Sequence, residues 1–253
     1  MDRIFSNLLL GFLLTLLCAY LVRLVAQGRA RFDRVDRQGG SAVLGKSAME
    51  MLYWGIQPAA RFLAWAGVTP NVVTWGNFFL TLLAAGFVAK GYLGVGAFVA
   101  TFSSILDALD GLLARMTGTT SDAGAVLDAT VDRYSEFFLI GALVLLYRDT
   151  PWLLILALVA LAGSFMVSYT TAKGKELRIE VPQGSMRRPE RTVLIILGIF
   201  LSSFPVPGLQ EGYPIWAALA LIAVLANKSV WDRSMAMARV AREREGKGTG
   251  IRQ

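Results

Sequence analysis

The chain has 253 residues, of which 55% are hydrophobic and 17% charged, with a formal net charge of +7 and a mean hydropathy of +0.54. Repeated apolar runs near the roughly 20 residues that span a bilayer exclude an ordinary soluble domain and predict an all-α integral membrane protein. No nucleic-acid motif or basic-aromatic stripe accompanies the positive charge, so we expect it to face the anionic headgroups of a lipid bilayer rather than nucleic acid.

The first apolar stretch covers residues 4–25, which is long enough to cross a bilayer. This run exceeds the roughly 7–15 residues of a signal-peptide core, its start carries no net positive charge, and no convincing cleavage site follows. We therefore expect residues 1–26 to be a retained transmembrane anchor added to the membrane core. Cys18 is the single cysteine, so it can form no intrachain disulfide.

Residues 27–70 connect this anchor to the core. They begin with a polar, basic linker and continue in residues 47–66, an amphipathic segment with Trp54, Pro58, Phe62 and Trp65. Aromatic side chains are enriched where a membrane meets water, and amphipathic helices lie in that layer. The segment therefore predicts an interfacial helix, with an ordinary surface helix as the alternative.

Six further apolar segments predict a six-helix transmembrane core over residues 71–230. They cover residues 72–89, 92–115, 123–147, 152–171, 192–204 and 213–226. The fifth segment is short unless its helix extends back through residues 188–191. After the core we expect a basic cytoplasmic tail over residues 231–253.

The distribution of basic residues predicts the orientation of these segments. If residues 26–70 are cytoplasmic, alternation leaves only Arg3, Lys90 and Arg148 of the 25 Lys and Arg residues on the outer side. Basic residues are enriched in cytoplasmic loops. We therefore expect a protein of a prokaryotic inner (plasma) membrane whose polar site opens to the cytoplasm.

Two consecutive segments carry carboxylates and small residues at helical spacing. These stripes contain Asp107, Asp110, Gly111 and Ala114 on the first segment, and Gly124, Asp128 and Asp132 on the second. The polar linker between them suits a helix-to-helix turn, with Asp122 as the cap of the second helix. Two adjacent antiparallel helices would bring the four carboxylates together.

The chemistry of this cluster points to a metal. A carboxylate inside a membrane costs about 2.5–3.5 kcal/mol on insertion scales, so such residues are functional candidates. Because the chain has no His and one Cys, a metal site here would consist of oxygen ligands, which suit a hard divalent cation. The flanking runs are too apolar for these carboxylates to be the solvated face of a surface helix.

The whole pattern, D-x-x-D-G-x-x-A-R-x₈-G-x₃-D-x₃-D, resembles the signature of the CDP-alcohol phosphotransferase (CDP-alcohol phosphatidyltransferase) family at every fixed position. Residues 69–74, Thr-Pro-Asn-Val-Val-Thr, resemble the T-P-N-x-x-T start of that family's first core helix. The resemblance covers residues from about 47 to 230. It implies a six-helix membrane fold, a homodimer, and transfer of the phosphatidyl group of CDP-diacylglycerol to a polar alcohol with release of CMP.

The resemblance also implies roles for individual residues. Asp107, Asp110 and Asp128 would hold Mg²⁺ or Mn²⁺, while Asp132 would be the base for the attacking hydroxyl, a further metal ligand, or both. The residues implied in nucleotide binding are Asn71, Thr74, Asp107, Asp110, Gly111, Ala114, Arg115 and Gly124. For Arg115, an interfacial side chain that reaches toward the headgroups is the alternative.

The acceptor is indicated by a basic loop between the fourth and fifth core segments, which is either a topology signal or an anion pocket. Residues 184–191 resemble a G-x-x-E-R-P-E-R segment of bacterial phosphatidylinositol-phosphate synthases, with Arg188 and Arg191 at acceptor-phosphate positions. Lys173 stands where a similar upstream segment has Arg, Thr171 replaces a Lys, and Arg187 replaces a Glu. We therefore expect a phosphorylated alcohol, with inositol phosphate ahead of glycerol phosphate.

Two other functions remain open from the sequence. A membrane prenyltransferase also uses Asp-rich helices and Mg²⁺, although the fixed Gly, Ala and Arg positions favour the CDP-alcohol family. A divalent-cation transporter would place its carboxylates near mid-membrane on a transport path, rather than at one helix mouth beside a basic loop.

Overall fold

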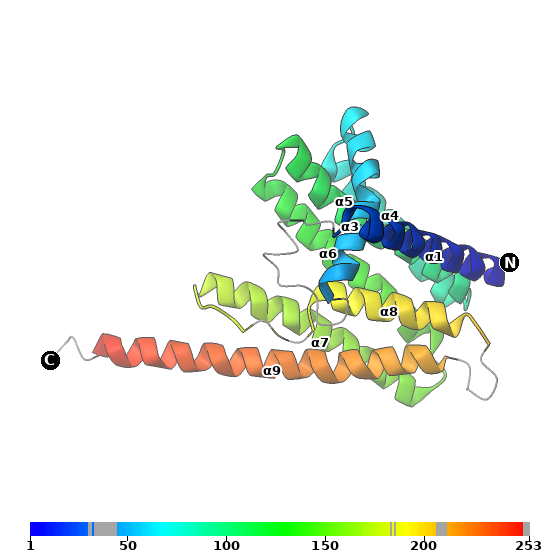
Figure 1. The fold of residues 1–253 in the computed structure, drawn as a ribbon. Helices are drawn as coiled ribbons and strands as arrows, with labels where there is room; N and C mark the ends of the chain where they lie inside the picture. Colours follow the sequence, from blue (N-terminus) through cyan, green and yellow to red (C-terminus); the bar gives the residue numbers. More distant parts are fainter. Residues whose placement is uncertain (30–31, 33–44, 183, 185, 206–211, 250–253) are drawn as a thin grey trace.

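The computed structural model describes residues 1–29, 32, 45–182, 184, 186–205 and 212–249, and all of the secondary structure in this part of the chain is helical (Figure 1). The helices are α1 (Asp2–Gln27), α3 (Gly45–Trp65), α4 (Pro70–Ala89), α5 (Leu93–Thr117), α6 (Asp122–Leu146), α7 (Pro151–Glu176), α8 (Arg188–Ser202) and α9 (Tyr213–Thr249). The expected all-α class is confirmed, and each predicted apolar segment forms a helix.

Among the described residues, 5 helices are long and apolar enough to cross a membrane: α1, α4, α5, α7 and α9. The chain is therefore an integral membrane protein. Helix α8 has 15 residues, or about 22 Å at ~1.5 Å per residue, which is shorter than a bilayer core. Helix α6 carries Asp128, Asp132 and Glu136 within the first 15 of its 25 residues, and these charges interrupt its apolar run. The polar parts of these two helices form much of the site described below.

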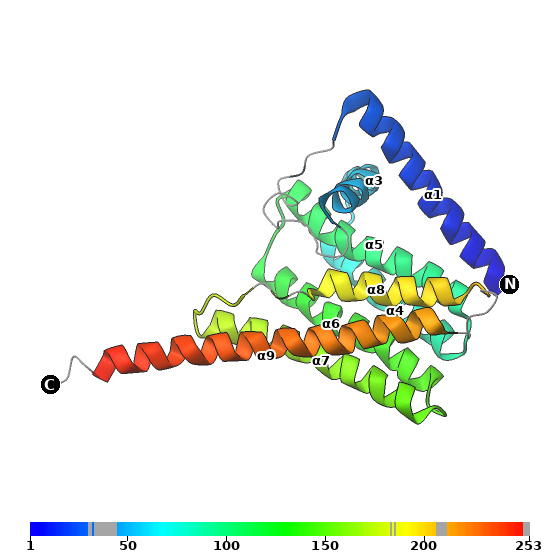
Figure 2. The same ribbon diagram turned by 60° about the horizontal axis from the view of Figure 1, so that its bottom comes forward.

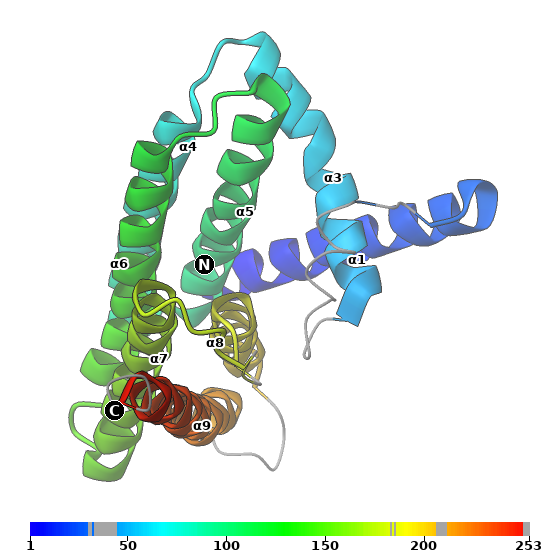
Figure 3. The same cartoon turned by 90° about the vertical axis from the view of Figure 1, so that its left-hand side faces the viewer.

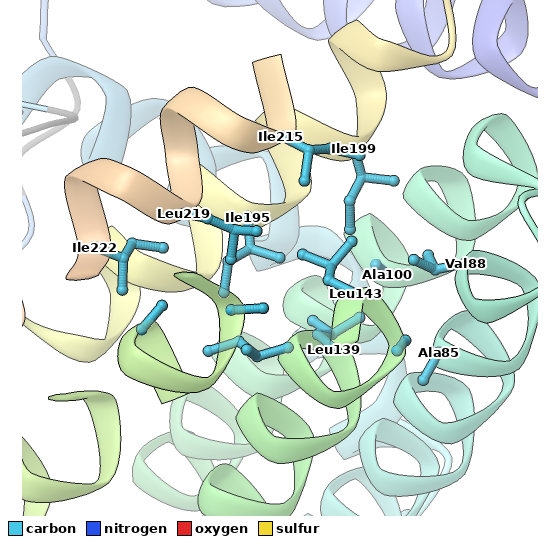
Figure 4. Packing of buried hydrophobic residues seen from close by; sticks show 14 of the residues in the cluster. Ala85, Val88, Ala100, Leu139, Leu143, Ile195, Ile199, Ile215, Leu219 and Ile222 are labelled. Atoms are coloured by element: carbon cyan, nitrogen blue, oxygen red, sulfur yellow. The ribbon is translucent and has the colours of Figure 1, made fainter. Parts of the chain in front are cut away.

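Helices α4–α9 pack as a bundle whose apolar half is closely packed. Figure 4 shows side chains from α4, α5, α6, α8 and α9 meeting in one cluster, among them Val88, Ala100, Leu143, Ile199 and Leu219. Where α4 meets α5 the side chains are small, and a Cβ added to Gly96 would lie 2.5 Å from a methyl carbon of Val88. Small residues let membrane helices approach closely, so this half of the bundle is a fixed frame for the polar half.

Helices α5 and α6 do not pack directly along each other, which differs from the adjacent pair that the sequence predicts. Both pack extensively along α4, while the first turns of α8 approach them from another side (Figure 3). The helix ends are defined locally: α5 stops at Gly118, which has φ 67°, and α6 begins after Ser121. The space between the two helices is where the carboxylates meet.

The cap of α6 corrects one prediction. The N-cap is Ser121, whose side chain accepts a hydrogen bond from the Gly124 backbone nitrogen at 3.1 Å, and Asp122 is the first helical residue. Ser121 has the extended backbone that an N-cap requires. The Asp122 carboxylate still lies in the first turn, where a negative charge suits the helix dipole.

Helix α1 lies obliquely to the bundle (Figure 2), and its contacts run from its start to Tyr20. Phe5 and Phe12 pack against Phe98 and Phe102 of α5. Near its start, Asp2 accepts a hydrogen bond from the Val95 backbone nitrogen at 2.9 Å. Near its end, Tyr20 donates to Glu50 of α3 at 3.3 Å. The expected N-terminal helix is therefore present, and α3 forms the expected amphipathic helix, which packs Tyr53, Ile56 and other apolar residues against α5.

Helix α9 is longer than predicted. The last apolar segment ends at Ala226, but α9 continues without a break to Thr249 and so includes most of the expected basic tail. Lys228 and Asp232 pair at 2.8 Å one turn apart, and Arg244 donates to the carbonyls of Leu177 and Arg178, each at 2.8 Å. Helix α9 therefore reaches past the end of α7 (Figure 1). Pairs of opposite charges one turn apart stabilise a helix in this polar part.

Candidate active site

Three of the predicted metal carboxylates come together between α5 and α6. Asp107, Asp128 and Asp132 each offer an oxygen, and these oxygens all lie within 4.8 Å of one another. The fourth, Asp110, is buried and accepts a hydrogen bond from the Thr74 hydroxyl at 2.7 Å. The expected convergence of carboxylates is therefore present, although the closest group contains Asp132 rather than Asp110.

The donor set fits a divalent metal. Carboxylate oxygens are the ligands that hard cations such as Mg²⁺ and Mn²⁺ prefer. In addition, Oδ1 of Asp132 is buried and has no aligned hydrogen bond among the described residues. Nη2 of Arg188 lies 2.6 Å from this oxygen, and a buried carboxylate requires a positive partner of this kind, either a guanidinium or a metal ion. Asp107, Asp128 and Asp132 are thus the residues that could hold the ion directly.

A polar stripe of α4 supports the cluster, and of its residues only Thr74 was identified from the sequence. Nδ2 of Asn77 donates to Asp107 at 3.3 Å, while Oδ1 of Asn77 accepts from Ser103 at 2.6 Å. Thr74, Asn77 and Thr81 occupy positions i, i+3 and i+7 of an otherwise apolar helix. That spacing could have predicted the stripe, because polar residues repeated on one side of a membrane helix point to a polar partner inside the protein. Asn77 holds the orientation of the Asp107 carboxylate.

A cavity of about 440 Å³ lies on one side of the carboxylates. We call it the small-residue cavity. It is lined by seven of the predicted nucleotide-binding residues, namely Asn71, Thr74, Asp110, Gly111, Ala114, Arg115 and Gly124, and by Asp128. The eighth, Asp107, does not line it. The loops before α4 and after α5 complete the wall, so a ligand here would contact the start of α4, the end of α5 and the start of α6.

A second cavity, of about 650 Å³, lies on the Asp132 side. We call it the basic cavity, because six of its lining residues are basic. These are Arg133, Lys175, Arg187, Arg188, Arg191 and Arg233. They come from α6, α7, α8 and its preceding residue, and α9. Asp128 lines the small-residue cavity and Asp132 the basic cavity, so the carboxylate cluster lies between the two.

The three residues predicted to hold an acceptor phosphate have different environments. Arg188 lines the basic cavity and also contacts the carboxylates: its Nη2 lies 2.9 Å from Asp107 and 2.6 Å from Asp132. Lys173 pairs with Glu176 at 2.8 Å and is not among the residues that line the cavity. Lys175, two residues along α7, lines the cavity in its place.

Arg191 is paired within the protein. Its guanidinium is fully buried and pairs with Glu136 of α6 at 2.5 and 3.0 Å, and its third nitrogen donates to the carbonyl of Met186 at 3.1 Å. All three nitrogens are therefore used by the protein. Removing one partner from a buried ion pair destabilises a protein strongly, so we expect the pair of Arg191 and Glu136 to join α8 to α6.

Arg233 was missed, because the sequence analysis placed it in the tail. It lies in α9, where its Nη1 donates to Thr171 at 2.7 Å and to the carbonyl of Val167 at 3.2 Å. Its Nε is buried and has no hydrogen-bond partner among the described residues. Continuing the helical periodicity past Ala226 would have brought Arg233 to this face.

The start of α8 holds Arg188 in place. Helix α8 begins at this residue, Pro189 lies in the first turn, and Glu190 accepts a hydrogen bond from the Arg187 backbone nitrogen at 2.7 Å. This capping-box arrangement fixes the first turn. Arg188 and Arg191 therefore share one face of α8, as the spacing predicted, but they contact different partners on α6.

Comparison with known proteins identifies the family. The sequence profile of the CDP-alcohol phosphatidyltransferases matches residues 67–226. The chain is 32% identical over 226 residues to phosphatidylinositol phosphate synthase from Streptomyces avermitilis, covering 86% of this chain and 90% of the relative. It is 34% identical over 194 residues to the Mycobacterium tuberculosis enzyme of that name, covering 73% and 89%.

Solved structures agree with the sequence comparison. The Mycobacterium tuberculosis phosphatidylinositol phosphate synthase with CDP-DAG bound superposes with a TM-score of 0.64 at 30% identity, over 71% of this chain and 91% of that one. Its complex with manganese and citrate gives a TM-score of 0.65 at 31% identity, over 71% and 87%. The family profile spans the carboxylate cluster and both of its helices. This chain therefore belongs to the CDP-alcohol phosphatidyltransferase family and is an integral membrane transferase of phospholipid biosynthesis.

Proposed function

We propose that this enzyme transfers the phosphatidyl group of CDP-diacylglycerol to the hydroxyl of a phosphorylated polyol, with inositol phosphate preferred over glycerol phosphate, and releases CMP. The observation that carries the proposal is the position of the carboxylate cluster between a small-residue cavity and a basic cavity. Relatives named phosphatidylinositol phosphate synthase support this acceptor.

The small-residue cavity is proposed to hold the cytidine nucleotide. Gly111, Ala114 and Gly124 leave the backbone accessible, and Arg115 offers a guanidinium for a phosphate oxygen. Asp110 and Asp128 lie in the same wall, so a pyrophosphate bound there would lie beside the carboxylate cluster. The homologous enzyme with CDP-DAG bound supports this assignment of the donor.

A divalent cation, Mg²⁺ or Mn²⁺, would be held by Asp107, Asp128 and Asp132 and would supply charge neutralisation at the phosphoryl oxygens and at the leaving CMP. The homologous structure with manganese supports this role. The three carboxylates would hold the cation between the two cavities. Positioning and electrostatics account for most of the catalysis of phosphoryl transfer.

Asp132 is proposed to accept the proton of the attacking hydroxyl. It is the carboxylate of the cluster that lines the basic cavity, so an acceptor bound there would place its hydroxyl close to this side chain. The acceptor oxygen then forms a bond to the phosphorus that carries diacylglycerol, and the bond to the CMP oxygen breaks. Direct ligation of the cation by Asp132 is compatible with this role, because its carboxylate has two oxygens.

The charge of the basic cavity favours a phosphorylated acceptor. Lys175, Arg187, Arg188 and Arg233 line it together with Asp132, an excess of positive charge that a neutral alcohol would not compensate. Arginine forms paired hydrogen bonds with phosphate, which makes a phosphate group the natural partner. The membership of the family removes the support for the prenyltransferase and cation-transporter alternatives.

A CMP-release assay in detergent tests the proposal. CDP-diacylglycerol is supplied with inositol phosphate, glycerol phosphate or free inositol, and Asp122→Asn serves as a carboxylate control outside the cluster. We expect the highest kcat/KM with inositol phosphate and little activity with free inositol. A preference for glycerol phosphate would replace the acceptor but keep the reaction, whereas equal use of free inositol would contradict the role of the basic cavity.

We further propose a homodimer in a prokaryotic inner membrane with the site facing the cytoplasm. The distribution of Lys and Arg supports this orientation. Reporters fused after residues 90 and 148 should then report the outer side, and a reporter fused after residue 180 the cytoplasm. A cytoplasmic signal at residue 148 would contradict the orientation, and light scattering in detergent measures the oligomeric state.

A further inference from the structure

Arg188 lies at the point where the carboxylate cluster would hold a cation. Its Nη2 is 2.9 Å from Oδ1 of Asp107 and 2.6 Å from Oδ1 of Asp132, and its Nη1 donates to Oδ2 of Asp107 at 3.3 Å. Asp107 and Asp132 are two of the three carboxylates that form the candidate metal site. A single nitrogen of Arg188 thus bridges two of the carboxylates that could hold a divalent ion.

The guanidinium satisfies this site only partly. Oδ1 of Asp132 is close to Arg188 in distance, yet it is buried without an aligned hydrogen bond among the described residues. Nε of Arg188 is likewise buried without a partner there. In this position the Nη1 and Nη2 groups pair with Asp107, and neither Asp132 Oδ1 nor Arg188 Nε has an aligned hydrogen bond within the described part of the chain. A divalent ion takes oxygen ligands from several directions at once, and its double charge would neutralise both carboxylates.

Arg188 also lines the basic cavity, so a rotation of its side chain would place the guanidinium among the basic residues there. It is the first residue of α8, and its long side chain could turn toward the cavity without movement of the helix. The other basic residues of that cavity include Lys175, Arg187 and Arg233. A guanidinium directed there would be repelled by these charges unless an anion were bound among them.

We propose that Arg188 is an exchangeable counter-ion: a divalent cation displaces its guanidinium from Asp107 and Asp132, and the displaced guanidinium then binds the phosphate of the acceptor. The identity of the acceptor rests on the proposed function, whereas the exchange itself requires only a divalent cation and a phosphate. Cation and phosphate then bind with positive coupling. By thermodynamic linkage, each raises the affinity for the other by the same factor.

The test measures Mn²⁺ binding by electron paramagnetic resonance on the full-length enzyme, stripped of metal in detergent, with and without inorganic phosphate. For the wild type we expect saturating phosphate to tighten Mn²⁺ binding about tenfold, and saturating Mn²⁺ to tighten phosphate binding by the same factor. Titration of Mn²⁺ with phosphate in protein-free buffer corrects for complex formation in solution. Independent binding of the two ions to the wild type would overturn the proposal without any variant.

Arg188→Gln separates exchange from direct contact between the ions. We expect this variant to bind Mn²⁺ at least as tightly as the wild type without phosphate, because the competing charge is gone, and to lose most of the coupling. Arg233→Gln is the matched control: it removes a charge from the same cavity without a contact to Asp107 or Asp132. It should weaken phosphate binding and retain the coupling factor.

Arg188→Lys keeps the charge but lacks the fork, and it should show intermediate coupling. Weaker Mn²⁺ binding by Arg188→Gln, or unchanged coupling in it, would show that Arg188 is a fixed bridge and would overturn the proposal. Thermal unfolding of each variant identifies any loss of folding. If coupling to inorganic phosphate is present while inositol phosphate gives no CMP release, the exchange stands and the proposed acceptor fails.

Discussion

The two cavities beside the carboxylate cluster differ in how the chain builds them. The small-residue cavity comes mainly from residues 64–74 and 110–128, in the parts of α4, α5 and α6 nearest their connecting loops. The basic cavity draws on α6, α7, α8 and α9, with residues from 132 to 233. The first cavity is therefore formed by two short segments of the sequence, whereas the second depends on how four helices pack.

The largest effect is expected for the shared cluster, which both cavities need. Asp128→Asn should reduce turnover below detection, because an amide removes the charge that a hard cation requires. The assay is CMP release over a range of Mg²⁺ concentrations. Asp122→Asn lies six residues earlier on the same helix and outside the cluster, so it should retain turnover. Near-normal turnover of Asp128→Asn at limiting Mg²⁺ would show that Asp128 is not a metal ligand.

The next largest effect is expected for Arg191, on stability. The measurement distinguishes this paired arginine from Arg188 and Arg233, which are proposed to bind a ligand in the same cavity. Arg191→Ala leaves the Glu136 carboxylate buried without its partner, which should lower the free energy of unfolding by about 3–5 kcal/mol. Thermal unfolding in detergent measures this loss. The double variant Arg191→Met, Glu136→Leu should recover much of it, since the pair is replaced by apolar groups. Normal stability of Arg191→Ala with a raised KM for the acceptor would instead restore the binding role predicted from sequence.

A smaller loss is expected at Asp132, the carboxylate on the acceptor side. Asp132→Asn should lower kcat by a factor of about 10² or more, in the range of general acid–base catalysis, while CDP-diacylglycerol still binds. Equilibrium binding of the donor, measured beside CMP release, distinguishes the two effects. Joint loss of donor binding and turnover would make Asp132 chiefly a metal ligand.

The same comparison explains what could be predicted from sequence. The pattern around Asp107 and Asp132 predicted the convergence of carboxylates, because helical spacing and a short polar turn are local features. Arg191 pairs with Glu136, which lies 55 positions away in the sequence. Helix packing determines which nearby charge becomes its partner, and no local sequence signal specifies it. Arg233 was not predicted, because the predicted core ended where the hydropathy of the sequence fell. Helix α9 continues past that point, with charged residues at helical spacing and contacts with α7.

The central claim is that donor and acceptor bind on opposite sides of one carboxylate cluster. The most direct test is the KM for each substrate in two variants, Ala114→Leu in the small-residue cavity and Arg233→Gln in the basic cavity. Loss of a charge-assisted contact costs about 1.5–3 kcal/mol, so Arg233→Gln should raise the KM for inositol phosphate by about tenfold or more and leave that for CDP-diacylglycerol unchanged. Ala114→Leu should do the reverse, because its added volume fills the donor side. Equal rises in both KM values for either variant would contradict the separation of the two sites.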